Sequence, residues 1–378
     1  MPSPSGTRRV AWVSSWIARG AFGGGGDPDD RPGRTHSETA QKMINPVFDS
    51  WSPARKGRRA GFAAIAAVPA LAAGALVMMV CGTAHARASL PEQVVIDGQN
   101  IYPESISSAA DGRLFTGSFD GIIYRALPGS DRAHAWIRPD ERNGLLSVFG
   151  VLADERSGTL WVCSSPNSLR KPPSVGTAAV IAFDLKSGSL KGRYPFPAPG
   201  GVCNDITVAH DGTLYASDTP GGRILKLARG AKNLAVFADD PRLKGIDGLV
   251  LSGNGTLYVN IVSKGQLLRV DRRPDGTAGA ITELKISQPV RGPDGFRLIR
   301  GNRFLLAEGN GGRVDEVTIK GDEAAIKVLR EGLNSPTAVA LVDRTVYASE
   351  GKIGYLINPA LKGQDPGPFA LHAIPLPD

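Results

Sequence analysis

The segment CNDITVAHDGTLYASDT, residues 203–219, contains the pattern that decides the fold. Ile206 and Val208 are separated by one polar residue, and this period-two alternation predicts a β-strand. The triplet His-Asp-Gly at 210–212 is typical of a hairpin turn, because glycine adopts a positive φ without strain. The run LYAS after it alternates again. The segment is therefore predicted to form a two-stranded antiparallel hairpin.

The same unit occurs five more times, and successive copies start about 40–55 residues apart. These copies cover residues 103–121, 149–165, 246–261, 293–309 and 335–351. A further apolar run follows each hairpin, at residues 121–127, 180–185, 223–228, 266–271, 313–319 and 352–357. Each unit is thus a small antiparallel sheet that cannot bury both of its faces alone.

Radial packing of six such sheets would cover their faces and leave only short edges. We therefore predict an all-β, six-bladed β-propeller over residues 89–378, with a β-sandwich or a solenoid as the alternative. The last blade needs an outer strand to close the ring. We expect Val94–Ile96 to supply that strand beside Phe369–Ile374.

The chain before residue 89 has the pattern of an export signal. Within residues 43–88, a basic cluster precedes a long uncharged run and the small-residue sequence AHARAS, as in a cleavable signal peptide. The expected location is the periplasm or the outside of the cell. If the leader is not cleaved, the apolar run is long enough to anchor the chain in a membrane. Residues 1–42, rich in Gly, Arg and Asp, are predicted to be disordered or an untranslated extension.

The formal net charge of +8 belongs mostly to this leader, since residues 89–378 contain 33 Lys and Arg against 31 Asp and Glu. No basic stripe with interleaved aromatic residues occurs there, so nucleic acid is not an expected partner. The same region contains two cysteines, Cys163 and Cys203. An oxidising compartment would permit a disulfide between them; the alternative is two buried free thiols.

Polar residues recur at one position of the repeat, just before the first strand. Counting seven residues back from each hairpin turn, and aligning Val151 of the irregular second copy with Ile206, gives six equivalent positions. These are Glu104, Phe149, Asn204, Asp247, Asp294 and Pro336. First strands of a propeller lie nearest its axis, so three carboxylates and one amide should meet at the mouth of the channel. Carboxylates this close repel one another, and a hard divalent cation with oxygen ligands removes that cost.

The ends of the second strands should return to the same face as the ring. They place five polar side chains around a possible substrate pocket, or on a solvated rim: Asp120, Asp218, Asn260, Glu308 and Glu350.

One ordered set of motifs resembles the regucalcin–gluconolactonase–paraoxonase superfamily, of the senescence marker protein-30 type. The set consists of CND–DGTLY–SD, the DG and PDG strand entries, and the early PES. The resemblance covers about residues 101–357 and implies a six-bladed propeller with a divalent cation in the axial channel. The ligands it implies are Glu104, Asn204, Asp294 and, where most members have Asn, Asp247. Plant strictosidine-synthase-like propellers share the architecture without such a metal, and the carboxylate ring argues against that branch. Sugar-lactone members carry an Arg where this chain has Val202, which argues against a sugar lactone as substrate.

Two functions are compatible with these patterns. The first is a metal-dependent hydrolase of lactones or related esters, with Asp294 as general base, Asp205 as the alternative base, and calcium as the expected cation; magnesium, manganese and zinc are the alternatives. Its partner would be a small-molecule lactone or ester. The second is a non-catalytic propeller that binds a ligand or a protein. No Ser-His-Asp arrangement or GxSxG motif is present in the sequence.

Overall fold

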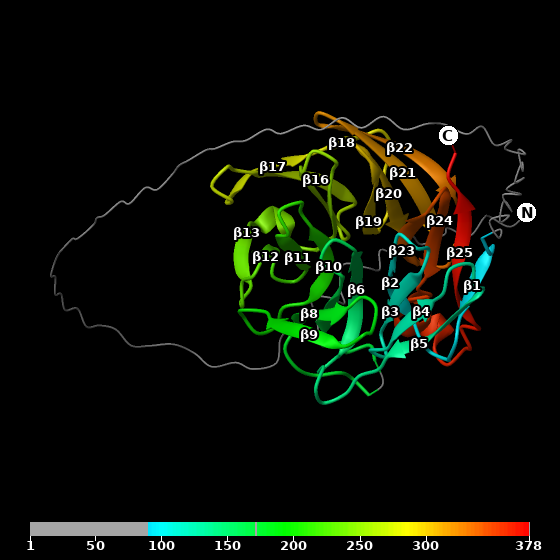
Figure 1. Cartoon of the computed structure of the whole chain (residues 1–378). Coiled ribbons are helices and arrows are strands. Elements are labelled where there is room, and N and C mark those ends of the chain that lie inside the picture. The colour runs from blue at the N-terminus through cyan, green and yellow to red at the C-terminus, as the bar shows by residue number, and fades with distance from the viewer. Residues whose placement is uncertain (1–89, 171, 378) are drawn as a thin grey trace, which may run out of the picture. The chain divides into compact units, whose positions relative to one another are not determined.

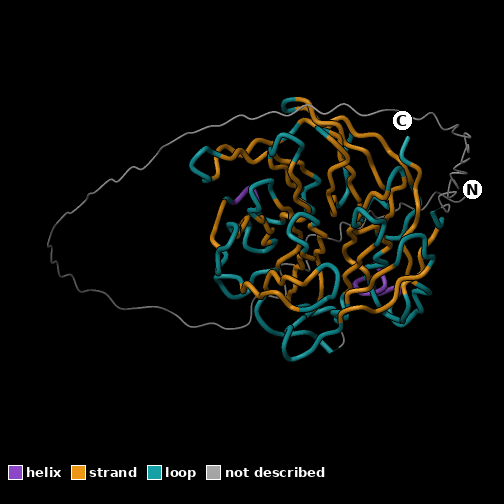
Figure 2. The backbone as a smooth tube through the Cα atoms, viewed as in Figure 1, coloured by secondary structure: helices purple, strands orange, loops and turns teal. Residues whose placement is uncertain are grey.

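The computed structural model describes residues 90–170 and 172–377, and this part of the chain is almost entirely β-structure. Strands and connecting loops make up nearly all of the coloured tube in Figure 2. The predicted leader, residues 43–88, and the preceding residues 1–42 lie outside the described residues. Among the residues described, no helix is long and apolar enough to cross a membrane.

Most of the strands form consecutive antiparallel groups of four. The first group contains β2 (Pro103–Ser108), β3 (Leu114–Ser118), β4 (Ile123–Ala126) and β5 (Arg132–Ile137). The second contains β6 (Ser147–Asp154), β7 (Thr159–Ser165), β8 (Ala179–Asp184) and β9 (Leu190–Pro195). The third contains β10 (Cys203–Val208), β11 (Leu214–Asp218), β12 (Arg223–Leu227) and β13 (Ala235–Asp239), followed by the short 3₁₀ helix η1 (Pro241–Leu243).

The remaining strands continue this order. The fourth group contains β14 (Ile246–Leu251), β15 (Leu257–Ile261), β16 (Gln266–Arg272) and β17 (Ala278–Glu283). The fifth contains β19 (Pro293–Arg300), β20 (Arg303–Glu308), β21 (Arg313–Lys320) and β22 (Glu323–Arg330), with β18 (Lys285–Ile286) added at its edge. The last contains β23 (Pro336–Val342), β24 (Thr345–Glu350), β25 (Phe369–Pro375) and, from the start of the described chain, β1 (Gln93–Ile96).

The first strands of these groups form a closed ring around a central axis (Figure 1). Strand β2 contacts β6, and the contacts continue through β10, β14, β19 and β23 back to β2. Apolar side chains fill the space between neighbouring sheets: Phe115 and Ile123 pack in one cluster with Val151 and Leu160. The fold is therefore a β-propeller, in which each sheet buries its faces against two neighbours.

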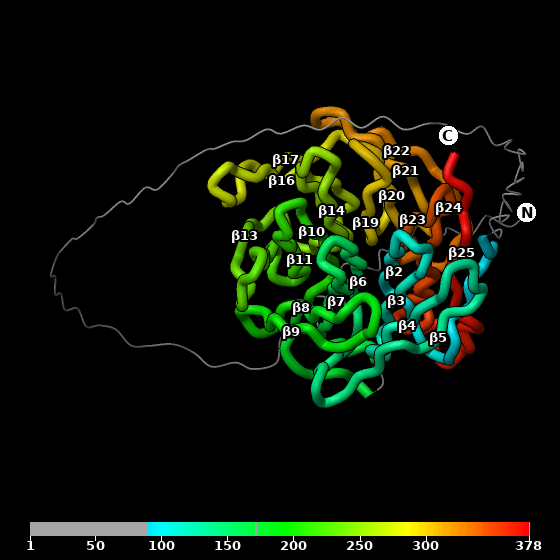
Figure 3. Tube along the Cα trace, viewed as in Figure 1, coloured from blue at the N-terminus to red at the C-terminus, as the bar shows by residue number. Residues whose placement is uncertain are grey.

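The predicted closing strand is confirmed. Strand β1 pairs antiparallel with β25, with Val94 opposite Leu371 and Ile96 opposite Phe369. Figure 3 shows the first described residues beside the red C-terminal strand. β1 also pairs in parallel with β5, so the first and last groups share one eight-stranded sheet.

We expect this closure to make a large contribution to stability. Val94 and Ile96 are each 1 % exposed, and full burial of such side chains is worth about 1.5–3 kcal/mol each. Deletion of Val94–Ile96 should therefore lower the free energy of unfolding by about 3–6 kcal/mol, measured by urea denaturation. Deletion of residues 1–85 is the control, and equal stabilities of the two truncated chains would count against this contribution.

One predicted strand is wrong. Residues 352–357 form no strand; they contain the helical turn α2 (Gly354–Ile357), which is followed by the 3₁₀ helix η2 (Pro359–Leu361). The place beside β24 is taken by β25. A short apolar run does not distinguish strand from helix, and Asn358, whose side chain accepts a hydrogen bond from the Ala360 N–H, begins the next helical turn.

Cys163 of β7 and Cys203 of β10 form a disulfide, with Cα atoms 5.0 Å apart. The bond joins two neighbouring sheets close to the axis. The sequence leaves open a disulfide or two buried free thiols, and the structure has the disulfide. An oxidising compartment allows such a bond.

Candidate functional site

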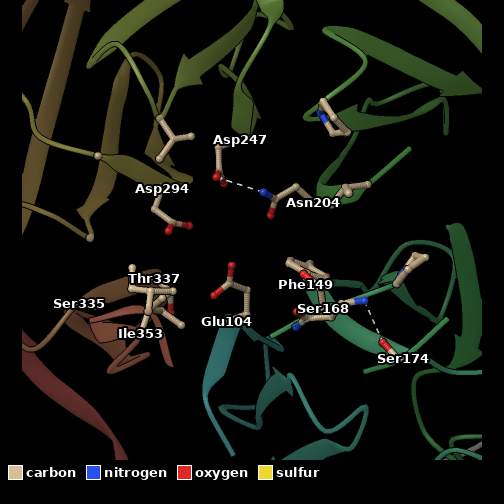
Figure 4. A pocket seen from close by; sticks show the side chains of 18 of the residues that line it. Glu104, Phe149, Ser168, Ser174, Asn204, Asp247, Asp294, Ser335, Thr337 and Ile353 are labelled. Atoms are coloured by element: carbon tan, nitrogen blue, oxygen red, sulfur yellow. Dashed lines mark hydrogen bonds between the residues drawn. The ribbon is translucent and has the colours of Figure 1, made fainter. Parts of the chain in front are cut away.

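A cavity of about 740 Å³ lies at the end of the ring where the first strands begin. The starts of β2, β10, β14 and β19 supply its polar floor through Glu104, Asn204, Asp247 and Asp294. Residues 166–168 and 173–176, between β7 and β8, and residues 353–354 and 357–358 supply much of its wall. Figure 4 shows the four polar side chains directed toward a common space.

A local irregularity of each first strand accompanies this convergence. The pairing register shifts between Pro103 and Ser105, and again between Cys203 and Ile206. Equivalent shifts bracket Asp247 and Asp294. A β-bulge re-aims the side chains beside it, so the repeated bulge places four polar residues at equivalent points of the ring.

The fifth and sixth positions of the ring are Phe149 and Thr337. Phe149 lines the cavity as the register predicts, whereas Thr337 does so in place of Pro336. The last hairpin has a two-residue turn, with Val342 paired to Thr345, while the hairpin after β10 has five residues between Val208 and Leu214. Because this turn is shorter, counting seven residues back from it gives Pro336, which is one residue before the side chain that lines the cavity.

Burial and neighbouring carboxylates destabilise the charged forms of the three ring carboxylates. Burial, followed by the nearby carboxylate of Asp205, raises the pKa of Asp247 to about 8. Burial and the Asp247 carboxylate raise the pKa of Glu104 well above its usual range. The same two causes, with a further contribution from Glu104, raise that of Asp294. Such shifts are expected where several carboxylates share a buried site, and the nearby Arg297 guanidinium offsets the shift of Asp247 only in part.

The hydrogen bonds of the ring leave oxygen atoms available to the cavity. The Asn204 Nδ2 group donates to Thr219 Oγ1 at 3.2 Å and to Asp247 Oδ2 at 3.1 Å. In this orientation the Asn204 Oδ1 oxygen faces the common space (Figure 4). Glu104 Oε2 is buried and has no hydrogen-bond partner within the described residues, an arrangement that is costly without a further partner.

The cavity has an unbalanced charge. Its described lining contains three carboxylates and no Lys or Arg side chain. Within residues 90–170 and 172–377, however, no group of three or more His, Cys, Asp or Glu side chains is placed closely enough to hold a metal ion as it stands.

Asp205 occupies a different environment from its neighbour Asn204. Its carboxylate accepts two hydrogen bonds from Arg297, at 2.7 and 2.8 Å, and one from the Leu249 N–H at 3.2 Å. Both side chains of this ion pair are largely buried, and Asp205 does not line the cavity. The pair joins β10 to β19, two first strands that are not neighbours in the ring.

The predicted substrate-binding side chains form hydrogen bonds or ion pairs with other residues of the protein, and none of them lines the cavity. Asp218 and Glu308 are fully buried and pair with Arg223 and Arg313. Asn260 donates to the Asp294 carbonyl oxygen at 2.5 Å. Asp120 accepts a hydrogen bond from the Ile122 N–H, and Glu350 contacts His372. Their common position at or near the end of the second strand thus reflects structural hydrogen bonds and ion pairs.

Glu308 has a buried carboxylate neighbour, Asp315. Burial and the Glu308 carboxylate raise the pKa of Asp315 to about 8, although Arg313 lies 3.4 Å from its Oδ1 atom. A carboxylate whose pKa is raised by folding contributes most stability below its unfolded pKa, and that contribution is lost as pH rises toward the folded value.

Asp315→Asn should therefore stabilise the protein at high pH. The amide keeps the shape and carries no charge, so the melting temperature of the variant relative to wild type should rise between pH 5 and pH 9. Asp131→Asn, at an exposed position, is the control. A constant difference across this range would contradict the assignment.

Three asparagine side chains of the cavity were not predicted: Asn167, Asn310 and Asn358. Asn167 is 5 % exposed, and its Nδ2 group is buried without a hydrogen-bond acceptor within the described residues. Its Oδ1 atom accepts a bond from the Leu169 N–H at 2.9 Å, which fixes the amide. Only the length of the segment between β7 and β8 could have indicated this wall, because four of the other five repeats have a short turn at that point. The last repeat has a longer connection there, between β24 and β25, which also lines the cavity.

Comparisons with known proteins agree with this fold. Residues 90–126 match the family model described as strictosidine synthase-like, N-terminal. The carboxylate ring predicted from the sequence speaks against this strictosidine-synthase-like branch. The matched segment contains one of the four polar ring residues, Glu104. No curated protein matches the sequence.

Solved structures that resemble the chain have low sequence identity and differ in activity. A gluconolactonase from Xanthomonas campestris has 16 % identity and a TM-score of 0.53 over 76 % of this chain and 98 % of its own. A luciferin-regenerating enzyme has 13 % identity and a TM-score of 0.53 over 74 % and 92 %. A streptogramin B lyase has 19 % identity and a TM-score of 0.51 over 70 % and 81 %. These similarities establish the fold, and the chemistry must be argued from the site.

Proposed function

Since the chain has the fold of the gluconolactonase-like β-propeller superfamily, we propose that it is a divalent-metal-dependent hydrolase of lactones or related esters. We count its eight-stranded sheet as two blades, which makes six blades around the axis.

The charge of the axial cavity carries this proposal. Glu104, Asp247 and Asp294 face one space whose described lining has no cationic side chain. Their raised pKa values mean that folding has placed acids where their charged forms are unfavourable. Buried acids with strongly raised pKa values in a cavity are typical of functional sites.

The donor set fits a hard cation such as calcium. Three carboxylates and the Asn204 amide oxygen are the ligands that calcium and magnesium prefer, and Glu104 Oε2 lacks any other partner in the described structure. Glu104, Asn204, Asp247 and Asp294 would hold the ion after side-chain adjustment. A bound divalent cation supplies positive charge that polarises a carbonyl group and stabilises an oxyanion.

Asp294 is our proposed general base. Water adds to the ester carbonyl carbon while the Asp294 carboxylate accepts its proton. When the bond from carbonyl carbon to alkoxy oxygen breaks, the proton passes to the leaving alkoxide. An ester then gives an acid and an alcohol, and a lactone gives one hydroxy acid. Asp205 is unsuited to this role because both of its oxygens are bound by Arg297.

The walls of the cavity indicate the kind of substrate. Phe149, Val202, Val262, Ile353 and Ile357 give it a large apolar surface. Asn167 also lines it, and its buried Nδ2 group has no hydrogen-bond acceptor in the described structure. We propose an uncharged lactone or ester with an apolar body, whose polar group is bound by Asn167. A sugar lactone fits this apolar lining poorly.

A panel of lactones and esters tests this function directly. Hydrolysis should be fastest for apolar esters or lactones with calcium, magnesium or manganese present, and should stop on chelation and return when metal is restored. Asn167→Ala should raise KM for these substrates. Metal-independent rates, or no hydrolysis across the panel, would favour a non-catalytic binding propeller.

Export is a separate proposal. A tagged chain expressed from Met43 should be recovered outside the cytoplasm with a new N-terminus near Arg87 or Ser89, read by N-terminal sequencing. An intact leader on a membrane-bound product would contradict cleavage.

A further inference from the structure

A second cavity, of about 490 Å³, lies between the sheets β6–β9 and β10–β13. Its lining includes the turn after β6 and the turn after β10, which are at the opposite ends of the first strands from the axial cavity. Strand β9 and residues 228–232, after β12, complete it. The second cavity is therefore distinct from the proposed metal site.

The lining of this cavity is strongly cationic. It contains one carboxylate, Asp154, against four cationic side chains: Arg156, Arg193, Arg229 and Lys232. The Asp154 carboxylate already has partners within the protein, since it lies 3.5 Å from the Arg156 side chain and accepts a hydrogen bond from Ser157. Arg229 and Lys232 form no ion pair or side-chain hydrogen bond with any described residue. This excess contrasts with the near balance of charge in residues 89–378 as a whole.

Aromatic side chains form another part of the lining. Trp161 and Tyr194 contact each other with ring centroids 6.1 Å apart, and both line the cavity together with Leu214 and Leu227. The Trp161 Nε1 atom is buried without a hydrogen-bond acceptor within the described residues. Flat apolar surface and free cations thus occur side by side.

We propose that this cavity binds a small organic anion that carries an aromatic ring. A phosphate or carboxylate group would lie against Arg229 and Lys232, because charge-assisted hydrogen bonds are the strongest such side chains form. The ring would pack on Trp161 and Tyr194, where aromatic stacking adds to apolar burial. The alternative is that these cations only form a solvated basic rim, but such a rim would need neither a cavity nor an aromatic surface beside it.

The chain offers a direct reporter, because Trp161 is one of five tryptophans. In full-length protein labelled with 5-fluorotryptophan, the Trp161→Phe variant identifies the Trp161 signal in the ¹⁹F spectrum. Phenyl phosphate should shift this signal saturably at or below millimolar concentration, and phenol should not shift it over the same range. An unmoved signal, or an equal shift with phenol, would overturn the proposal.

Removal of the two free cations provides the second arm of the test. The double variant Arg229→Met/Lys232→Met should bind phenyl phosphate at least tenfold more weakly. Arg300→Met/Lys320→Met removes two exposed cations far along the sequence and should bind like wild type. If the first double variant does not fold, Lys232→Glu at its exposed position should weaken binding by charge reversal. Unchanged affinity in the variants of Arg229 and Lys232 would also overturn the proposal.

Discussion

Replacement of Asp294 with alanine should reduce ester or lactone hydrolysis by a factor of about 10³ or more, since loss of a general base alone costs about 10²–10⁴ in rate. The variant should keep its fold. Without metal it should melt at a higher temperature than metal-free wild type, because a buried acid with a strongly raised pKa has been removed.

Two further variants define the role of Asp294. Asp294→Asn keeps the shape and an oxygen ligand but cannot accept the proton, so it should bind metal weakly and remain inactive. Asp120→Asn changes a carboxylate outside the cavity and should leave kcat and KM unchanged. Activity of Asp294→Ala near that of wild type would exclude Asp294 as the base.

Replacement of Arg297 with methionine should be the most destabilising single change in the channel. Arg297 donates two short hydrogen bonds to Asp205, and both side chains are largely buried. Removal of one partner leaves a buried uncompensated charge, which costs about 3–5 kcal/mol. Urea denaturation of wild type and variant at neutral pH measures this loss.

The double variant Arg297→Met/Asp205→Asn separates the loss of the pair from the loss of packing. It removes both charges and retains an oxygen that can accept the Leu249 N–H bond. The double variant should therefore recover most of the stability lost by Arg297→Met. If Arg297→Met alone lies within about 1 kcal/mol of wild type, the ion pair is not important for stability.

The repeat made much of this structure predictable. Five of the six hairpin units supply their third strand where the apolar runs indicate, and β1 closes the last sheet. Glu104, Asn204, Asp247 and Asp294 all reach the axial cavity because their positions follow from register alone. The pairing register depends on the alternation of apolar and polar residues and on turn length, and both can be read from the local sequence.

The parts that could not be predicted depend on tertiary contacts. The apolar run at residues 352–357 became a cavity-lining turn because Phe369–Pro375 takes the strand position. Asp218 and Glu308 turn inward to arginines that follow them in the chain. The ion pair of Asp205 with Arg297 joins residues 92 positions apart, and nothing in either repeat alone indicates it. Asn167 lies in a long connection between β7 and β8, where four of the other repeats have only a short turn.

The proposed hydrolase mechanism depends on the binding of a divalent cation by the axial carboxylates. Calorimetric titration of chelator-stripped protein with calcium tests it most directly. Wild type should bind one ion per chain, Asp247→Asn should bind it more weakly, and Asp294→Ala should bind it much more weakly or not at all. Absence of binding to wild type at millimolar calcium, magnesium and manganese, or equal binding by wild type and Asp294→Ala, would contradict the metal site and the hydrolase mechanism built on it.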